Sequence, residues 1–184
     1  MRIHCTKKML TAIKNSDGIF GDSKVAIDMD YDHATDSDEL YDWHANVVEL
    51  TRATVLVVLM NDKTYYPIVC GPIRLSKINR FLADFQSNLL QLMQETKIPE
   101  RIREDYVNDC KNVTFTKTLN RSKVSQLSSI GSDALHYVYY EDLNIKDIDP
   151  ISISVWLSDI YRTKDGVFQK PIDLWIEEWQ RRIH

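Results

Sequence analysis

Glycine is scarce in this sequence, with only five residues in a chain of 184. Such scarcity argues against a glycine-rich loop that cradles nucleotide phosphates, and neither Gly-x-x-x-x-Gly-Lys nor Gly-x-Gly-x-x-Gly occurs. His-Glu-x-x-His and Gly-x-Ser-x-Gly are absent as well. The usual signatures of phosphate-loop proteins, dinucleotide-binding proteins, zinc proteases and serine hydrolases are therefore missing.

Cysteine is also rare, with Cys5, Cys70 and Cys110 widely spaced along the chain. No Cys-x-x-Cys pair occurs, which argues against a zinc knuckle. Reduced, partly buried thiols are typical of a cytosolic protein. We therefore expect no bound cofactor and a cytoplasmic location.

Long apolar runs and an excess of basic charge are missing too. The first residues lack the apolar stretch of a signal peptide, and the most apolar run, 55–60, is far too short to span a bilayer. Lys and Arg number 23 against 27 Asp and Glu, which gives a net charge of −4. Because phosphate contacts drive non-specific nucleic-acid binding, such a role would need a local basic face.

The order of the apolar patterns predicts the fold class. Strand patterns cluster early and helical patterns late, which favours an α+β fold. We expect an antiparallel sheet of about four to five strands packed against several helices, with a helix-rich C-terminal half. The length is typical of one domain, 1–184, with an acidic loop at 28–42 and a helical extension at 147–184.

Apolar periodicity places the individual elements. Residues 43–51, 53–60 and 64–70 predict an antiparallel meander that ends at Gly71-Pro72. Further strands are expected at 3–5, 24–27 and 113–117. Helices are expected at 7–14 with Thr6 as the N-cap, from 76 to about 92, from 98 to about 106, at 119–140 and at 171–183. The segment 151–157 is ambiguous: its alternation favours a strand, whereas Asp149-Pro150 favours the start of a helix.

Four short motifs stand out together, and their ordered set is more specific than any one of them. They are Cys5-Thr6-Lys7-Lys8, Trp43-His44-Ala45-Asn46, Asn61-Asp62-Lys63-Thr64 and Phe115-Thr116-Lys117-Thr118-Leu119-Asn120-Arg121-Ser122. Together they resemble the bacterial and archaeal family catalogued as domain of unknown function 6933. The resemblance implies a small prokaryotic or phage-borne cytoplasmic protein and supplies no catalytic assignment. The Asp-rich loop and the Trp-rich tail depart from the family pattern.

The polar residues of these motifs stand at the ends of predicted elements, where a strand-to-helix junction offers free amides to an anion. Arg121 can bind a phosphate through two parallel hydrogen bonds, and His44 can move a proton. The candidate ligand-binding residues are Lys7, Asn46, Lys117, Asn120, Arg121 and Ser122, and the candidate catalytic residue is His44.

Simpler roles remain open for the same residues. Asn120 and Ser122 are good helix caps without any ligand. His44 on a strand is commonly a hydrogen-bonded structural residue. Cys5 with His44 could imitate a nucleophile pair, although nothing in the sequence fixes their separation.

The acidic loop matches part of a calcium-binding pattern. Positions one, three, five, nine and twelve of an EF-hand loop would be Asp28, Asp30, Asp32, Asp36 and Glu39. His33 stands where that loop needs glycine, and the preceding residues predict a strand instead of a helix. A solvated acidic loop is the default interpretation.

Trp175 and Trp179 share one face of the last helix and offer either core packing or a partner surface. With the acidic loop, they suggest a protein partner. The sequence thus predicts a binding or interaction module with a phosphate or nucleotide site. The alternative is a metal-independent phosphoryl-transfer or ribonuclease-like enzyme that uses His44 with Lys7 and Arg121.

Overall fold

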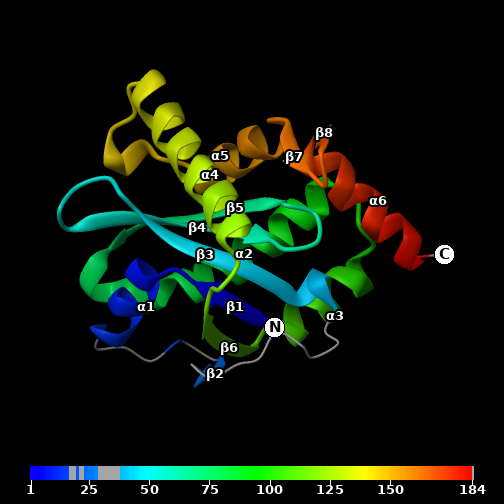
Figure 1. Ribbon diagram of the computed structural model, residues 1–184, viewed down its shortest axis with the longest axis horizontal. Helices are drawn as coiled ribbons and strands as arrows, with labels where there is room; N and C mark the ends of the chain where they lie inside the picture. The colour runs from blue at the N-terminus through cyan, green and yellow to red at the C-terminus, as the bar shows by residue number, and fades with distance from the viewer. Residues whose placement is uncertain (17–19, 21–22, 29–37, 184) are drawn as a thin grey trace.

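The computed structural model describes residues 1–16, 20, 23–28 and 38–183 (Figure 1). Its strands are β1 (Arg2–Cys5), β2 (Lys24–Asp28), β3 (Asp42–Glu49), β4 (Thr54–Asn61), β5 (Pro67–Arg74), β6 (Asn112–Lys117), β7 (Arg162–Lys164) and β8 (Val167–Gln169). Its α-helices are α1 (Lys7–Lys14), α2 (Phe81–Glu95), α3 (Glu100–Asp109), α4 (Arg121–Tyr140), α5 (Pro150–Ser158) and α6 (Pro171–Ile183). Short 3₁₀ helices cover Glu39–Tyr41, Leu75–Arg80 and Ile145–Asp147.

One sheet of six strands, in the order β2-β6-β1-β3-β4-β5, organises the chain. The predicted α+β class is confirmed, and so is the antiparallel meander, which is β3-β4-β5. The sheet has six strands where about four to five were expected, and it is mixed instead of antiparallel, because β2, β6, β1 and β3 are mutually parallel. Parallel pairing joins segments far apart in sequence, so local periodicity does not reveal it.

Helices cover both faces of this sheet (Figure 1). On one face, α1, α2, α3 and α6 enclose the larger apolar core. On the other face, α4 and α5 pack over β4 and β5 around a smaller core. Side chains alternate along a strand, so successive residues of β1 and β3 serve opposite faces.

Side-chain caps explain where several helices begin. Thr6 caps α1 by accepting a hydrogen bond from Met9 N, as predicted, and Asn120 caps α4 by accepting from Lys123 N. Asp149 caps α5 by accepting from the amides of Ile151 and Ser152. The ambiguous segment 151–157 is therefore helical, as the Asp-Pro signal favours.

Two glycines allow close approaches of the backbone. Gly71 has a φ of +105°, and a Cβ there would lie 3.0 Å from the carbonyl oxygen of Val55. It sits where the pairing of β4 and β5 shifts register, so the third meander strand continues to Arg74 instead of ending at Gly71-Pro72. Gly131 lets α4 approach β3, because a Cβ there would lie 2.9 Å from Val48 Cγ2.

The C-terminal part contains one element that the sequence did not predict. β7 and β8 form a separate antiparallel hairpin between α5 and α6. The predicted last helix is present as α6. Among the helices that the structure describes, none combines the length and apolarity needed to cross a membrane.

Candidate functional site

One face of the sheet turns polar where β1, β3 and β6 lie side by side. The parallel register sets His4 of β1 beside both His44 of β3 and Thr116 of β6. Their neighbours Ile3 and Trp43 point to the larger core on the opposite face. The α4-facing side over β4, in contrast, is lined by apolar residues such as Val58. The polar patch therefore lies over β1, β3 and β6.

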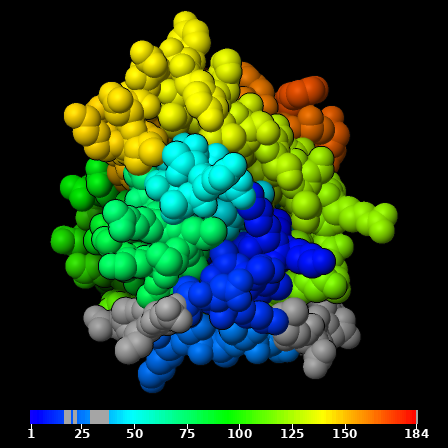
Figure 2. All heavy atoms as spheres, turned by 90° about the vertical axis from the view of Figure 1, so that its left-hand side faces the viewer, coloured from blue at the N-terminus to red at the C-terminus, as the bar shows by residue number. Residues whose placement is uncertain are grey.

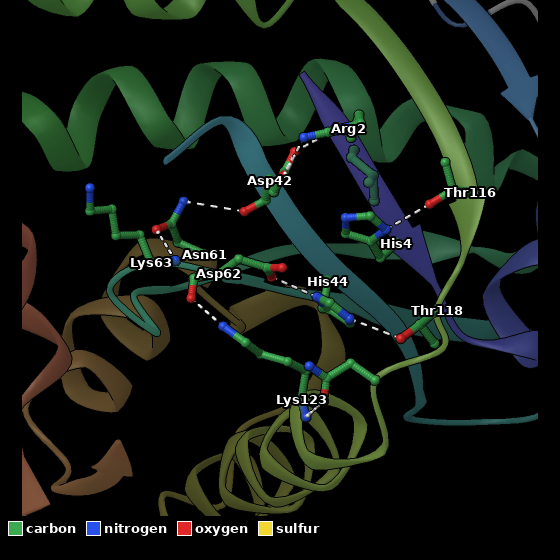
Figure 3. A network of polar contacts seen from close by, with 12 residues as sticks. Arg2, His4, Asp42, His44, Asn61, Asp62, Lys63, Thr116, Thr118 and Lys123 are labelled. Atoms are coloured by element: carbon green, nitrogen blue, oxygen red, sulfur yellow. Dashed lines mark hydrogen bonds and ion pairs between the residues drawn. The ribbon is translucent and has the colours of Figure 1, made fainter. Parts of the chain in front are cut away.

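His44 lies at the centre of this patch and bonds through both ring nitrogens (Figure 3). Its Nδ1 is 2.6 Å from Oδ1 of Asp62, in the turn after β4. Its Nε2 is 2.8 Å from the hydroxyl oxygen of Thr118, directly after β6. The His44 side chain is only 2% exposed, whereas Thr118 is partly exposed. The buried His44 thus links Asp62 and Thr118, which are both partly exposed.

Asp62 is held in its ionised form. Burial by itself would raise the pKa of Asp62, but the hydrogen bond and charge of His44 and the charge of Lys123 outweigh it and lower the pKa. An ionised carboxylate accepts the Nδ1 proton of His44. In the neutral imidazole, Nε2 then carries the lone pair and accepts the hydroxyl proton of Thr118.

Lys123, in the first turn of α4, connects that helix to the turn after β4 by a hydrogen bond. Its ammonium group donates to the backbone carbonyl oxygen of Asp62 and lies 4.5 Å from the centre of the Tyr65 ring. Burial lowers the pKa of Lys123, and the charge of Asp62 partly opposes this effect. Sequence reasoning missed this residue, although its place three positions after the capping Asn120 puts it in the same helical turn.

His4 forms a second histidine–threonine pair beside the first. Its Nδ1 is 2.7 Å from the hydroxyl oxygen of Thr116, and its ring centre lies 4.9 Å from that of His44. Two residues before His4, and so on the same face of β1, the guanidinium group of Arg2 donates two hydrogen bonds of 2.8 and 2.7 Å to the carboxylate of Asp42. Neither His4 nor Arg2 was predicted, because a four-residue strand carries too little pattern to show its neighbours.

The predicted ligand-binding residues surround the carboxyl ends of β1 and β6. Asn46 is fixed by Thr6, whose hydroxyl donates to Asn46 Oδ1 across 2.7 Å. Asn120 is a helix cap, as the simpler interpretation held, whereas Ser122 lies inside α4 and does not cap it. Four exposed side chains complete this edge. They are Lys117 at the end of β6, Lys7 at the start of α1, and Arg121 and Ser122 at the start of α4.

The connections after β1 and β6 diverge at this edge. α1 follows β1 onto the face of the larger core, and α4 follows β6 onto the opposite face. The two strands are adjacent, and Thr118 N donates to the carbonyl oxygen of Cys5 across 3.1 Å. The space-filling view shows the N-terminal segment against the start of α4 (Figure 2). In open α/β sheets, ligands bind in the crevice outside the carboxyl ends of strands at such a switch point.

Lys7 also borders a groove along α1. The groove has a volume of about 730 Å³ and lies between α1, the end of β3 and the start of the 3₁₀ helix Leu75–Arg80. On the same helix, Lys8 pairs with Glu49 at 2.9 Å. Lys7 therefore lines this groove, and the partners of His44 are Asp62 and Thr118 instead.

A Cys5–His44 nucleophile pair is ruled out by geometry. Cys5 belongs to the larger core, on the face of the sheet opposite to His44. Its thiol donates weakly to the carbonyl oxygen of Ile3 at 3.5 Å, and burial raises its pKa. A buried thiol with a raised pKa is not a nucleophile.

A family model for a domain of unknown function, DUF6933, matches residues 2–174. The chain belongs to this family. No curated protein matches the sequence. The match confirms the resemblance carried by the four motifs.

In the structure, hydrogen bonds connect residues of all four motifs. Thr6 of the first motif binds Asn46 of the second. His44, also of the second, binds Asp62 of the third and Thr118 of the fourth. Each of the four motifs therefore contributes at least one residue to these hydrogen bonds.

The partner surface predicted at Trp175 and Trp179 is not available. Their side chains are 0% and 4% exposed, and Trp175 stacks on Tyr66 with ring centres 4.8 Å apart. The rings seal the larger core because α6 turns its apolar face inward. The family match ends at residue 174, so both tryptophans lie beyond it.

The acidic loop is described only at its two ends. Asp28 ends β2, and Glu39 begins a 3₁₀ helix. At the same end, Asp38 pairs with Arg182 of α6 at 2.7 Å. The possible calcium ligands Asp30, Asp32 and Asp36 lie outside the described residues.

Proposed function

We propose that this DUF6933 protein binds a phosphate-bearing ligand at the carboxyl edge of β1 and β6. The observation that carries the proposal is that hydrogen bonds at this edge connect residues of all four motifs, through the Thr6–Asn46 pair, the Asp62–His44–Thr118 chain and the backbone bond from Thr118 to Cys5. The motifs are far apart in the sequence, and this network brings them to a single place.

Stability alone gives no reason for such a network. Buried ion pairs replaced by well-packed apolar residues leave proteins equally stable or more stable in many cases. The same face of the sheet is apolar over β4, where Val58 and Leu56 pack against α4 and α5. Buried polar residues at positions where apolar residues would pack as well or better are typical of functional sites.

The local charge supports an anionic ligand. The chain as a whole carries −4, yet Lys7, Lys117 and Arg121 are exposed around this edge. Both α1 and α4 begin here, and the first amides of a helix lack intrahelical acceptors. Arg121 would hold the phosphate by two parallel hydrogen bonds, and the amide of Asn46, oriented by Thr6, would bind a neighbouring polar group.

The proposal assigns the protein to the cytoplasm of a prokaryotic or phage-infected cell. Cys5, Cys70 and Cys110 are all buried free thiols, which suits a reducing compartment. Phosphate-bearing metabolites and nucleotides are abundant ligands in that setting.

Calorimetric titration with inorganic phosphate, pyrophosphate and nucleoside diphosphates tests the proposal. We expect Arg121→Gln to weaken binding roughly 10- to 100-fold, because a charge-assisted hydrogen bond contributes about 1.5–3 kcal/mol. Arg101→Gln is the matched control, since Arg101 is 92% exposed on α3 and makes only a 3.8 Å pair with Asp105. Equal affinity of the two variants, or no binding by the unmodified protein, would overturn the proposal.

A further inference from the structure

We propose that Thr118 is a catalytic nucleophile, activated by His44 and oriented through Asp62, that accepts an acyl group from an ester or thioester. We also expect the site to prefer acyl donors whose leaving group is negatively charged, and this preference rests on the anion site proposed above. The nucleophile itself rests only on the Asp62–His44–Thr118 geometry.

The three side chains have the spacing that nucleophilic catalysis requires. A hydroxyl, a base and an orienting carboxylate act together when each link is about 2.6–3.2 Å long. The Asp62–His44 link is 2.6 Å and the His44–Thr118 link is 2.8 Å. The two links use opposite nitrogens of one imidazole, so the carboxylate fixes the tautomer and Nε2 is left to accept the hydroxyl proton.

The chain provides a built-in comparison. The His4–Thr116 link is 2.7 Å, as short as the link to Thr118. Thr116, however, is completely buried, whereas Thr118 is partly exposed at the end of β6. Of these two histidine-bonded hydroxyls, Thr118 is the one positioned to meet a ligand.

The proposed step balances in protons and bonds. Thr118 Oγ1 forms a bond to the carbonyl carbon while its proton passes to His44 Nε2. The bond from that carbon to the leaving oxygen or sulfur then breaks, and His44 returns the proton to the leaving group. A water molecule, deprotonated by His44, releases the acid and restores the Thr118 hydroxyl.

The start of α4 supplies donors for the negative charge that develops on the carbonyl oxygen. Asn120 occupies the amide of Lys123, which leaves the preceding amides of Arg121 and Ser122 at the open end of the helix. Thr118 lies just before this end. Fixed backbone amides beside a nucleophile are the usual stabilisers of such an oxyanion.

Covalent capture tests the nucleophile directly. A neutral alkyl fluorophosphonate ester is attacked by an activated hydroxyl, which forms an oxygen–phosphorus bond and releases fluoride. We expect peptide mass spectrometry to find the adduct on Thr118, and Thr118→Val to abolish it. Thr118→Ser should restore labelling, and His44→Gln should slow it at least about 100-fold.

Thr116→Val is the matched control, because it removes the hydroxyl group that is hydrogen-bonded to His4 and should leave labelling of Thr118 intact. Thermal unfolding of each variant separates loss of reactivity from loss of fold. Labelling at another residue, or equal rates in His44→Gln and the unmodified protein, overturns the inference. So does a folded Thr118→Ser variant that fails to label.

Competition by inorganic phosphate separates this inference from the proposed function. Protection of Thr118 from the probe by phosphate supports both. Labelling without any phosphate binding keeps the nucleophile and removes the anion site and the donor preference. Phosphate binding without labelling keeps the anion site and removes the nucleophile.

Discussion

Asn61 shapes the turn that carries Asp62, because its side-chain oxygen accepts the hydroxyl proton of Thr64 across 3.0 Å. The same oxygen accepts the amides of Lys63 and Thr64, each at 3.1 Å. Its amide nitrogen donates to the carbonyl oxygen of Leu40 at 2.9 Å. One buried side chain therefore fixes both the turn and the approach to β3.

Removing this side chain should loosen the turn and weaken the whole fold. We expect Asn61→Ala to lower the free energy of unfolding by about 2–4 kcal/mol, since several buried groups lose their partners at once. Urea denaturation measures the change. Asn88→Ala is the comparison, because Asn88 makes a 2.8 Å bond to the carbonyl oxygen of Val69 and its loss should cost about 1 kcal/mol. Similar costs for the two variants would contradict the role assigned to Asn61.

The ionisation of Asp62 should make stability depend on pH. Its folded pKa lies below the ordinary value, so its contribution is complete above about pH 4 and is lost as the pH falls through the folded pKa. The unfolding free energies of the unmodified protein and Asp62→Asn should therefore differ more at pH 7 than at pH 3. Asp105→Asn, at an exposed pair of 3.8 Å, should show little difference at either pH. A gap for Asp62→Asn that widens in acid would contradict the assignment.

Gly131 and Val48 should behave as a coupled pair. The Cβ of Gly131→Ala would lie 2.9 Å from Val48 Cγ2, and overpacking of this kind costs about 1–3 kcal/mol. Adding Val48→Ala should recover much of that cost, which a double-mutant cycle measures. Ser132→Ala, at an exposed position of the same helix, removes only a surface hydroxyl that donates to the carbonyl oxygen of Ser128, and it should change stability by no more than about 0.5 kcal/mol. Additive effects of the two changes at 48 and 131 would rule out the contact.

The C-terminal helix should contribute strongly to stability through Trp175. Because this ring is fully buried, Trp175→Ala should cost about 3–5 kcal/mol in urea denaturation. Tyr140→Ala removes an aromatic ring that is 77% exposed and should cost far less. If the two substitutions proved equally mild, α6 would be a dispensable addition to the family domain.

Local signals in the sequence predicted much of the fold. Thr6 marked the start of α1, Asp149-Pro150 that of α5, and the β-branched run the central strand of the meander. Strand order could not be predicted, because β1 pairs in parallel with β3 and β6 through contacts between residues distant in sequence. A short strand such as β1 carries no local sign of those neighbours.

The sequence predicted only part of the candidate site, because it does not show which strands are neighbours. His44 and the junction at Asn120 were identified by residue type and position, and Asn120 proved to be a cap. Asp62 was recognised only as a turn residue, and Thr118 only as part of a motif. Their roles depend on which strands lie side by side, which the sequence pattern does not state.

The central position of β1 in the sheet also affects how the chain folds during its synthesis on the ribosome. Arg2–Cys5 are synthesised more than a hundred residues before Asn112–Lys117, the strand that flanks them on one side. At about 5–20 residues per second, the nascent polypeptide waits several seconds or more with β1 open along that edge. A chaperone that shields exposed strand edges should therefore raise the yield of native protein during synthesis.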